Sequence, residues 1–572
     1  MSTHATTSSP VKGEEVPQNG IAGLKHLRHD ILSGLVVSLV SLPLSSGIAI
    51  ASGVPPIYGL ISAIIAGLVL PLLGGSYMTI AGPAAGLAPA ILTLTIALGG
   101  AGDAEHVGAG YPLLLVIIFM VGCLQLVLAL FKMARFAAII PISVVEGMLC
   151  SIGLLIVVKQ LPMFFGYTGK VHAHEFFEYV MQIPHFAVHL TTLPFVVAAA
   201  SLVMLFVLNG LSRKVALLRV VPPQLFAVVF GVALGYFLQL GAVNHGSFLI
   251  KLPETPFHGA HLPNFAALLA RQDLWYAAFL GVIMLTMIDG IESLATAMAV
   301  DRIDPYRRKS QPNRLLFAMG VCNIASSLVG GLTIIPGGVK SKVNVASGGR
   351  TLWANFTNAI CLIVFLMFGQ QWINMIPKGV LAAVLIFTGW KMCEPLVWRQ
   401  VARIGKEQLA LFTFTVLVTL WTDLLIGILA GVVAKCLINV MLCRNAVQTS
   451  PDHSVSMHGY MFDFFRNPVC KQSVEDGVWH LYVDKPLVCF NSMKLEESLA
   501  VVPPEVKSIC LHLNPRVPLI DHTACETLHQ LTETFEHSST PLSIVGLERM
   551  MRLSKHISSV YVVDPVPASQ LL

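Results

Sequence analysis

Fourteen apolar segments constrain the fold of this 572-residue chain more than any other feature. A helix needs about 20 apolar residues to cross the hydrocarbon core of a bilayer. Two segments, at residues 79–98 and 333–349, are interrupted by Gly and Pro. The other twelve are continuous and lie at residues 31–50, 57–73, 112–130, 137–158, 193–208, 221–240, 274–300, 315–329, 352–368, 376–390, 409–420 and 424–442. The pattern predicts an α-helical membrane protein with fourteen spans.

The composition agrees with a chain that faces lipid. Hydrophobic residues make up 55% of the sequence and charged residues only 12%, whereas a soluble domain carries about 25% charged residues. We therefore expect the lipid bilayer to be a partner. The net charge of +5 gives no reason to expect a nucleic-acid partner. The 11 cysteines include no closely spaced pair, so neither a disulfide framework nor a metal site is predicted.

Basic residues gather in the loops that follow even-numbered spans. Such loops should lie on the cytoplasmic side. The loop after the third span, at 102–108, is acidic instead. We therefore expect a multi-pass protein of the inner (plasma) membrane with both termini in the cytoplasm. The basic residues in question are Lys132, Arg135, Arg213, Lys214, Arg219, Arg302, Arg307, Arg308, Lys309, Arg314, Lys391, Arg399, Arg403 and Lys406.

The two interrupted segments are the third and the tenth spans, so each is the third of a half containing seven. Paired breaks at corresponding positions indicate a transporter's binding site. A helix that begins there presents unpaired N–H groups and a partial positive charge, which favour an anion. The predicted anion-binding residues are Ala84, Ala85, Gly86, Gly337, Gly338, Lys340 and Ser341. The alternative is that these are ordinary helix kinks whose lysines extend to the membrane surface.

Three polar residues recur on one face of the eighth span. Asp289, Glu292 and Thr296 are three and four residues apart, and acids within a membrane are costly and usually functional. They could take up a proton, coordinate Na⁺ or offset the charge of Lys340. The alternative is a buried salt bridge with no role in transport. We expect no resident cofactor, with Na⁺ as the candidate coupling ion.

The sequence divides into three parts. Residues 1–23 are polar and are expected to form a disordered tail, and residues 24–445 form the membrane domain. Residues 450–565 alternate short β-branched runs with helical patterns, which is typical of a small α/β domain. This domain has no Walker-type phosphate-binding loop. An ATP-driven pump is therefore not expected, and the chain is not expected to be an enzyme, which leaves secondary transport or a channel.

The chain resembles the sulfate permease (SulP) family over residues 24–560. Each motif is weak alone, and the ordered set is specific. The segments that carry the resemblance are Ser41-Leu-Pro-Leu44, Gly53-Val-Pro-Pro-Ile-Tyr-Gly59, Ala81-Gly-Pro-Ala-Ala-Gly86, Asp301-Arg-Ile-Asp-Pro-Tyr306, Asn313-Arg314, Val343-Asn-Val-Ala-Ser-Gly-Gly-Arg-Thr351, Ile376-Pro-Lys-Gly-Val-Leu-Ala-Ala-Val-Leu385 and Asp423-Leu-Leu-Ile-Gly427.

The resemblance implies a seven-plus-seven inverted repeat, in which a core and a gate domain move against each other around an anion site between the third and tenth spans. Lys340 stands where the family usually has Arg. Glu292 and Thr296 match positions that bind Na⁺ in sodium-dependent bicarbonate members. Leu44 replaces a frequent Gln, and Lys342 and Asp289 also depart from the family pattern.

The C-terminal domain resembles the STAS domain. Its segment Leu519-Ile-Asp-His-Thr-Ala524 matches the Asp-Ser-Ser-Gly loop of that domain, so the STAS loop here is Asp521, His522 and Thr523. His522 stands at the usual phosphoacceptor position, which argues against phosphorylation of the kind seen in soluble relatives.

The sequence thus predicts a secondary active transporter that moves a small inorganic anion, sulfate or bicarbonate, by alternating access with coupling to Na⁺ or H⁺. We expect a homodimer. The alternatives are a dicarboxylate or chloride transporter or exchanger of the same fold, or a non-transporting anion sensor. A proton-coupled nucleobase permease is disfavoured because it needs neither the STAS-like tail nor the paired lysines of the tenth span.

Overall fold

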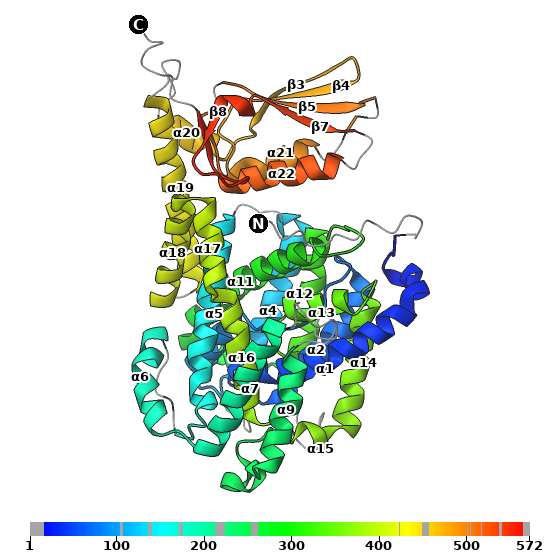
Figure 1. The fold of residues 1–572 in the computed structure, drawn as a ribbon, viewed down its shortest axis with the longest axis vertical. Coiled ribbons are helices and arrows are strands. Elements are labelled where there is room, and N and C mark those ends of the chain that lie inside the picture. Colours follow the sequence, from blue (N-terminus) through cyan, green and yellow to red (C-terminus); the bar gives the residue numbers. More distant parts are fainter. Residues whose placement is uncertain are drawn as a thin grey trace. The chain divides into compact units, whose positions relative to one another are not determined.

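Figure 1 shows the computed structural model of the chain, which folds into two compact units. The first unit contains residues 1–134 and 152–392, and the second contains residues 135–151 and 393–572. The structure describes residues 16–102, 107–134, 140–169, 171, 175–211, 223–252, 261–422, 424–448, 457–499, 502–503, 505–515, 517–536 and 540–563.

The first unit is almost wholly helical. Its elements are η1 (Gly20–His26), α1 (Leu27–Ala51), α2 (Pro56–Leu73), β1 (Ala81–Pro83), α3 (Ala88–Ala97), α4 (Tyr111–Leu130), α5 (Ile142–Phe164, which begins in the second unit), α6 (Phe176–Val188), α7 (Thr192–Leu211), α9 (Pro223–Phe237), η3 (Leu240–Gly246), α10 (Phe265–Ala270), η4 (Gln272–Leu274), α11 (Trp275–Asp301), α12 (Pro312–Leu328), β2 (Ile334–Pro336), α13 (Gly338–Ala346), α14 (Trp353–Phe368), α15 (Gln370–Ile373) and α16 (Lys378–Cys393).

Each of the fourteen apolar segments predicted from the sequence overlaps one of the helices. Among the described residues, 8 helical stretches are long and apolar enough to cross a membrane, and α3, α9 and α14 are shorter apolar helices. The chain is therefore a multi-pass membrane protein. The count of fourteen spans stays a prediction, because the helices of the broken segments are too short to cross a bilayer alone.

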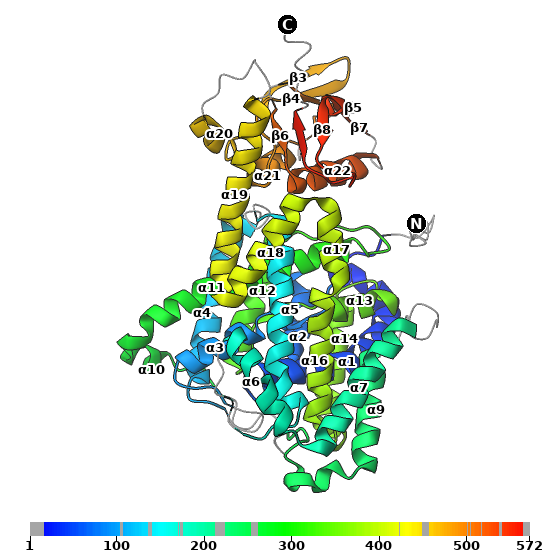
Figure 2. The same ribbon diagram turned by 60° about the vertical axis from the view of Figure 1, so that its left-hand side comes forward.

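Close helix contacts in the first unit depend on small residues. The helices α1, α2 and α14 pack on one another, and α12 packs on both α2 and α4. Where α4 meets α12, a Cβ at Gly122 would lie 2.7 Å from the carbonyl oxygen of Gly320. Small residues at such crossings let backbones approach, which is how helices gain packing energy in lipid. A second pair, α7 and α9, lies side by side (Figure 2).

Both interrupted segments form a short strand followed by a short helix. The strands β1 and β2 pair antiparallel, with Ala81 opposite Pro336 and Pro83 opposite Ile334. Segments related by an inverted repeat run in opposite directions, so antiparallel pairing is the direction that such a repeat requires. We call this pair of strands, β1 with β2, the ribbon. The ribbon joins the third and tenth predicted spans in the interior of the first unit.

The second unit contains the last helices and an α/β domain. Its elements are α17 (Pro395–Ile404), α18 (Lys406–Trp421), α19 (Leu424–Gln448), α20 (Met457–Asp463), β3 (Val469–Glu475), β4 (Val478–Val483), α21 (Cys489–Leu499), β5 (Ser508–Leu513), β6 (Leu519–Ile520), α22 (His522–Glu536), β7 (Leu542–Val545), η5 (Leu547–Arg549), β8 (Met550–Arg552) and β9 (Tyr561–Val563).

The α/β domain is built on two small sheets with strand orders β3-β4-β5-β7 and β6-β9-β8. In the four-stranded sheet β3 is antiparallel and the other strands are parallel. The helices α21 and α22 lie along one face of it (Figure 1). Alternate strand residues such as Trp479, Leu481 and Leu511 fill the core against these helices. They alternate because successive side chains of a strand point to opposite faces of the sheet. The predicted class of this domain is therefore confirmed.

The predicted domain boundaries, including that of the N-terminal tail at residue 23, stay predictions. Most of the expected N-terminal tail lies outside the described residues. Its end does not: η1 begins at Gly20, and the Asn19 side chain donates to Ser76 O at 2.6 Å and accepts from Leu352 N at 3.1 Å. These bonds attach the chain at Asn19 to the segments that contain Ser76 and Leu352.

A buried ion pair joins α19 to the α/β domain within the second unit. Lys435 Nζ lies 3.4 Å from Asp521 Oδ2, and both side chains are at most 1% exposed. The same carboxylate accepts hydrogen bonds from Asn439 Nδ2, Cys489 N and Ala524 N. Burial alone would raise the pKa of Asp521, but Lys435 and these donors together hold the pKa below its ordinary value. The interaction therefore stabilises the fold at neutral pH and is lost as the pH falls below about 4.

We expect Lys435→Met to destabilise the junction between α19 and the STAS loop. The substitution leaves a buried carboxylate without its cation, which costs about 3–5 kcal/mol. In hydrogen-exchange mass spectrometry of the detergent-solubilised protein, peptides covering residues 487–525 should lose protection by about a hundredfold or more. Lys507→Met, at an exposed lysine of the same unit, should change nothing.

The double variant Lys435→Met/Asp521→Asn removes both charges and should recover much of that protection. Full protection in Lys435→Met alone would show that the ion pair contributes little to the junction.

Candidate functional site

The backbone of the broken segments is hydrogen-bonded by polar side chains from neighbouring helices. Asn355 accepts from Ala81 N at 2.9 Å and donates to Thr79 O at 2.6 Å. Asn344 Nδ2 donates to Met78 O at 2.9 Å. Irregular backbone at membrane depth needs such partners because lipid supplies none. These amides therefore hold β1 in its extended form.

Lys340 lies over the ribbon formed by β1 and β2. Its side chain is 1% exposed, and its Nζ has no hydrogen-bonding or ion-pairing partner among the described residues. A Cβ at Gly82 would overlap Nζ, and one at Gly337 would lie 2.8 Å from Lys340 Cε. Both glycines therefore make room for the lysine. A buried ammonium without a counter-charge is costly, and this one lies at the first turn of α13.

Glu292 lies against the turn that precedes α3. The N–H of Gly86 donates a hydrogen bond to the Glu292 carboxylate, and a Cβ at Gly86 would overlap that carboxylate. The second oxygen, Oε2, has no partner among the described residues, and the residue is 8% exposed. Glycine at position 86 therefore permits direct contact between the α11 carboxylate and the backbone before α3.

The same helix also passes the start of α13. Thr296 is one turn beyond Glu292, about 6 Å along the helix axis. A Cβ at Gly338, the first residue of α13, would lie 3.8 Å from Thr296 Cγ2. One turn of α11 therefore spans from the approach to α3 to the start of α13. Two of the residues predicted for the cation, Glu292 and Thr296, therefore lie against two of those predicted for the anion, Gly86 and Gly338.

Asp289 is placed differently from its neighbours on α11. Gln125 Nε2 donates to its Oδ1 at 2.6 Å, Asn323 Nδ2 donates to its Oδ2 at 3.1 Å, and Ser293 Oγ donates at 3.3 Å. Asn323 Oδ1 in turn accepts from Ile334 N at 2.6 Å. The carboxylate therefore connects α4, α11 and α12 to β2, and its oxygens are engaged in holding the ribbon.

The other predicted anion-binding residues lie at the ribbon ends. Ala84 is buried and its N–H donates to Thr333 O at 3.2 Å, whereas Ala85 is half-buried. The Ser341 hydroxyl accepts from Ile80 N at 2.9 Å and donates to Gly337 O at 2.7 Å. Ser341 therefore pins the start of α13 to β1. Lys342, in contrast, is exposed.

Sequence reasoning missed the amides that surround the ribbon. These are Gln125, Asn323, Asn344 and Asn355, all fully buried. Amide side chains inside otherwise apolar segments were the available signal, because such groups need partners in lipid. It also missed a set of buried polar atoms without partners among the described residues: the hydroxyls of Ser41, Ser45 and Ser46 on α1 and both amide atoms of Asn358 on α14. The helix α1 contacts β1, α13 and α14.

The STAS loop is buried within the second unit. Asp521 pairs with Lys435, and His522 is 4% exposed, with Nδ1 at 2.6 Å from Ser558 O. Burial lowers the pKa of His522, so the ring is neutral at physiological pH. Thr523 is 7% exposed and its hydroxyl accepts from Ile142 N at 3.4 Å. All three residues thus pack at a junction between elements.

The fold and the site define a membrane transporter built on two broken spans that meet at a buried ribbon. The family model described as the sulfate permease family matches residues 27–415. The chain therefore belongs to the sulfate permease family, whose members are transporters rather than enzymes. Its C-terminal α/β domain is consistent with a STAS domain.

Two curated relatives resemble most of the chain. The putative sulfate transporter YvdB of Bacillus subtilis is 26% identical over 94% of this chain and 95% of its own length. The bicarbonate transporter BicA of Picosynechococcus is 24% identical over 75% of this chain and 73% of its own length.

Solved structures show the same fold. The transmembrane domain of a cyanobacterial BicA superposes with a TM-score of 0.59 at 23% identity, covering 72% of this chain and 97% of that domain. The structure of SLC26A9 superposes with a TM-score of 0.62 at 17% identity, covering 90% of this chain and 84% of that one.

We expect Gly86→Ala to fold but to transport poorly. The added Cβ displaces the flexible end of Glu292 rather than backbone, so packing adapts while the carboxylate leaves its place. Uptake into proteoliposomes should fall by about tenfold or more. Gly210→Ala adds a methyl group to open space and should behave like the parent, whereas Gly59→Ala would collide with Ser45 O and should fail to fold. Normal uptake by Gly86→Ala would show that the position of Glu292 does not matter.

Proposed function

We propose that the chain is a secondary active transporter that carries a small inorganic anion, sulfate or bicarbonate, across the plasma membrane by alternating access. The named relatives support this, because they include sulfate and bicarbonate transporters. We place the anion between the beginnings of α3 and α13.

The observation that carries the proposal is the buried Lys340 ammonium. It has no partner among the described residues and lies beside two glycines at the ribbon. A bound anion supplies the missing counter-charge, and the first N–H groups of α13 add hydrogen-bond donors and a partial positive charge. An anion of either kind accepts several such bonds at once.

Coupling to Na⁺ is the version of the proposal that the geometry supports best. Glu292 Oε2 lacks a hydrogen-bond partner among the described residues, and Thr296 offers a second oxygen one turn further along α11. Oxygen donors of this kind suit a hard cation. Glu292 and Lys340 do not form an ion pair with each other. The cation would therefore bind the Glu292 carboxylate, and the anion would bind the Lys340 ammonium. The oxygens of Asp289 already accept hydrogen bonds from Gln125 and Asn323, so we do not assign this residue to the cation in the proposal.

Two other functions keep the same fold. A dicarboxylate or chloride transporter or exchanger would use the same lysine, and a non-transporting anion sensor would bind without flux. A counterflow panel of sulfate, bicarbonate, chloride and dicarboxylates in proteoliposomes separates all of these. The cytoplasmic position of both termini and assembly as a homodimer stay predictions.

Lys340→Ala should weaken anion uptake while Lys342→Ala leaves it unchanged. The two lysines are two residues apart on α13, but Lys340 is buried at the ribbon and Lys342 is exposed. Loss of a charge-assisted hydrogen bond should raise the half-saturating anion concentration by about 10- to 100-fold. Equal uptake kinetics in the two variants, at equal reconstitution, would remove Lys340 from the anion site.

Glu292→Gln should abolish the dependence of uptake on the driving cation. A neutral amide coordinates Na⁺ poorly and releases no proton. Asp289→Asn is the matched variant: it disturbs a structural network and should lower the folded yield without changing which cation drives uptake. The measurement is initial uptake with imposed Na⁺ or H⁺ gradients. Uptake by the parent protein that ignores both gradients would overturn coupling altogether.

A further inference from the structure

One face of the four-stranded sheet carries polar side chains that the transport site does not use. The strands β4 and β5 alternate, so Trp479, Leu481 and Leu511 point into the core while His480, Cys510 and His512 project from the opposite face. Figure 1 shows α21 and α22 on the core side only. His480 and His512 are half-buried, and Cys510 is 9% exposed.

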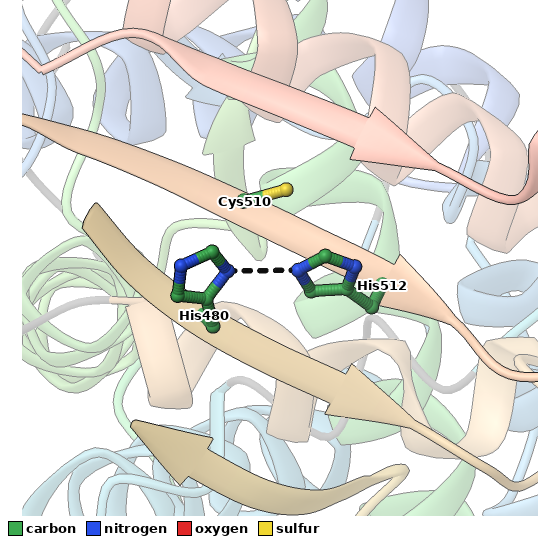
Figure 3. Close-up of side chains that lie close together, drawn as sticks. All are labelled: His480, Cys510 and His512. Atoms are coloured by element: carbon green, nitrogen blue, oxygen red, sulfur yellow. Dashed lines mark hydrogen bonds between the residues drawn. The ribbon is translucent and has the colours of Figure 1, made fainter. Parts of the chain in front are cut away.

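The register of the two strands brings these three side chains together. His480 lies directly opposite Cys510 in the parallel pair, and His512 follows two residues later on the same face of β5. Figure 3 shows both imidazoles turned toward each other beside the thiol. His480 Nδ1 is 2.8 Å from His512 Nε2, and one ligand atom from each of the three residues lies within 4.8 Å of the others.

The imidazole pair is arranged around a single shared proton. One ring must donate through its N–H while the other accepts through its lone pair. Full protonation of both rings would place two positive charges in contact. Tyr482 stacks on His512 with ring centroids 4.7 Å apart and an angle of 13°, which fixes the orientation of that ring. A metal ion can take the place of the shared proton, since it too is held by the lone pairs of neutral rings.

We propose that His480, Cys510 and His512 bind a borderline transition-metal ion, Zn²⁺ by preference, on the open face of the C-terminal sheet. Two imidazole nitrogens and one thiolate are a donor set that suits zinc. On binding, the Cys510 thiol gives its proton to solvent. The proton between the two neutral rings moves to the outer nitrogen of the ring that carried it, so that all three donors present lone pairs to the ion. Three protein ligands leave one tetrahedral position for water or an exchangeable ligand.

The geometry needs only small side-chain adjustments to hold the ion. Zinc–nitrogen bonds of about 2.0 Å and a zinc–sulfur bond of about 2.3 Å set the nitrogens roughly 3.3 Å apart in a tetrahedron and each nitrogen roughly 3.6 Å from sulfur. The nitrogens must therefore separate slightly and the thiol must approach. Both changes are within the reach of side-chain rotation, because the strand pairing that holds the three Cα atoms stays as it is.

Cobalt binding tests the proposal directly, because a thiolate ligand gives Co²⁺ a near-ultraviolet charge-transfer band that histidine alone does not. The full-length protein is purified without a histidine tag, under reducing conditions and after chelation, and titrated with Co²⁺ and then Zn²⁺. We expect the band to appear and Zn²⁺ to abolish it. It should be absent in Cys510→Ser and weakened by about tenfold or more in apparent affinity in His512→Gln.

Cys470→Ser is the matched control, because Cys470 lies on the neighbouring strand β3 and is exposed. It should keep the band. A band that is absent from the parent protein would overturn the proposal, because no thiolate would then bind the ion. A band that survives in Cys510→Ser would also overturn it, because another cysteine would then be the ligand.

A second measurement needs no variant and so does not depend on how the variants fold. The parent protein is alkylated with iodoacetamide with and without Zn²⁺, and modification of each cysteine is followed by mass spectrometry. Coordination should slow alkylation of Cys510 by about tenfold or more, while Cys470 in the same sample changes little. Equal alkylation of Cys510 with and without Zn²⁺ would overturn the proposal. Neither measurement depends on transport, so a negative result for the metal site leaves the proposed anion site untouched, and the reverse also holds.

Discussion

The structure of the first unit depends on satisfying the backbone at two places where membrane helices break. Lipid offers no hydrogen bonds, so an extended segment at membrane depth must find its partners inside the protein. Here the two breaks pair with each other as β1 and β2, and buried amides complete the bonding. Because each break depends on the other, the third and tenth predicted spans are fixed together. The beginnings of α3 and α13 are left close to one turn of α11.

That arrangement places two opposite charges near the ribbon without pairing them. Lys340 is buried over Gly82 and Gly337, and Glu292 is bonded to the backbone of Gly86. An internal ion pair would have neutralised both residues. Keeping them apart leaves one positive and one negative group without each other as a partner, and on the proposed function these groups would bind the anion and the cation. The neighbouring Asp289 serves a different purpose, because its bonds to Gln125 and Asn323 support β2.

The sequence was sufficient to locate the breaks but not to show how they are held. Gly and Pro inside apolar segments indicate a break from local sequence alone, and they draw attention to Gly86 and Lys340. Glu292 could be singled out as an acid within the eighth apolar segment. The partners of the ribbon come from α4, α12, α13 and α14, far away in the chain, so no local pattern connects Asn323 or Asn355 to it. For the same reason Asp289 and Glu292, three residues apart on one helix face, looked equivalent. The cluster of His480, Cys510 and His512 was invisible because strand register brings it together and the cysteine spacing shows no metal motif.

The proposed function depends on an anion that binds at the ribbon, against Lys340 and the beginning of α13. A cryo-electron microscopy map of the protein with its transported anion, compared with one prepared without it, tests this most directly. We expect added density within hydrogen-bonding distance of Lys340 Nζ and of the first N–H groups of α13, on the side of the ribbon where α11 carries Glu292 and Thr296. Anion density at another place in the bundle, with Lys340 Nζ unliganded, would contradict the account.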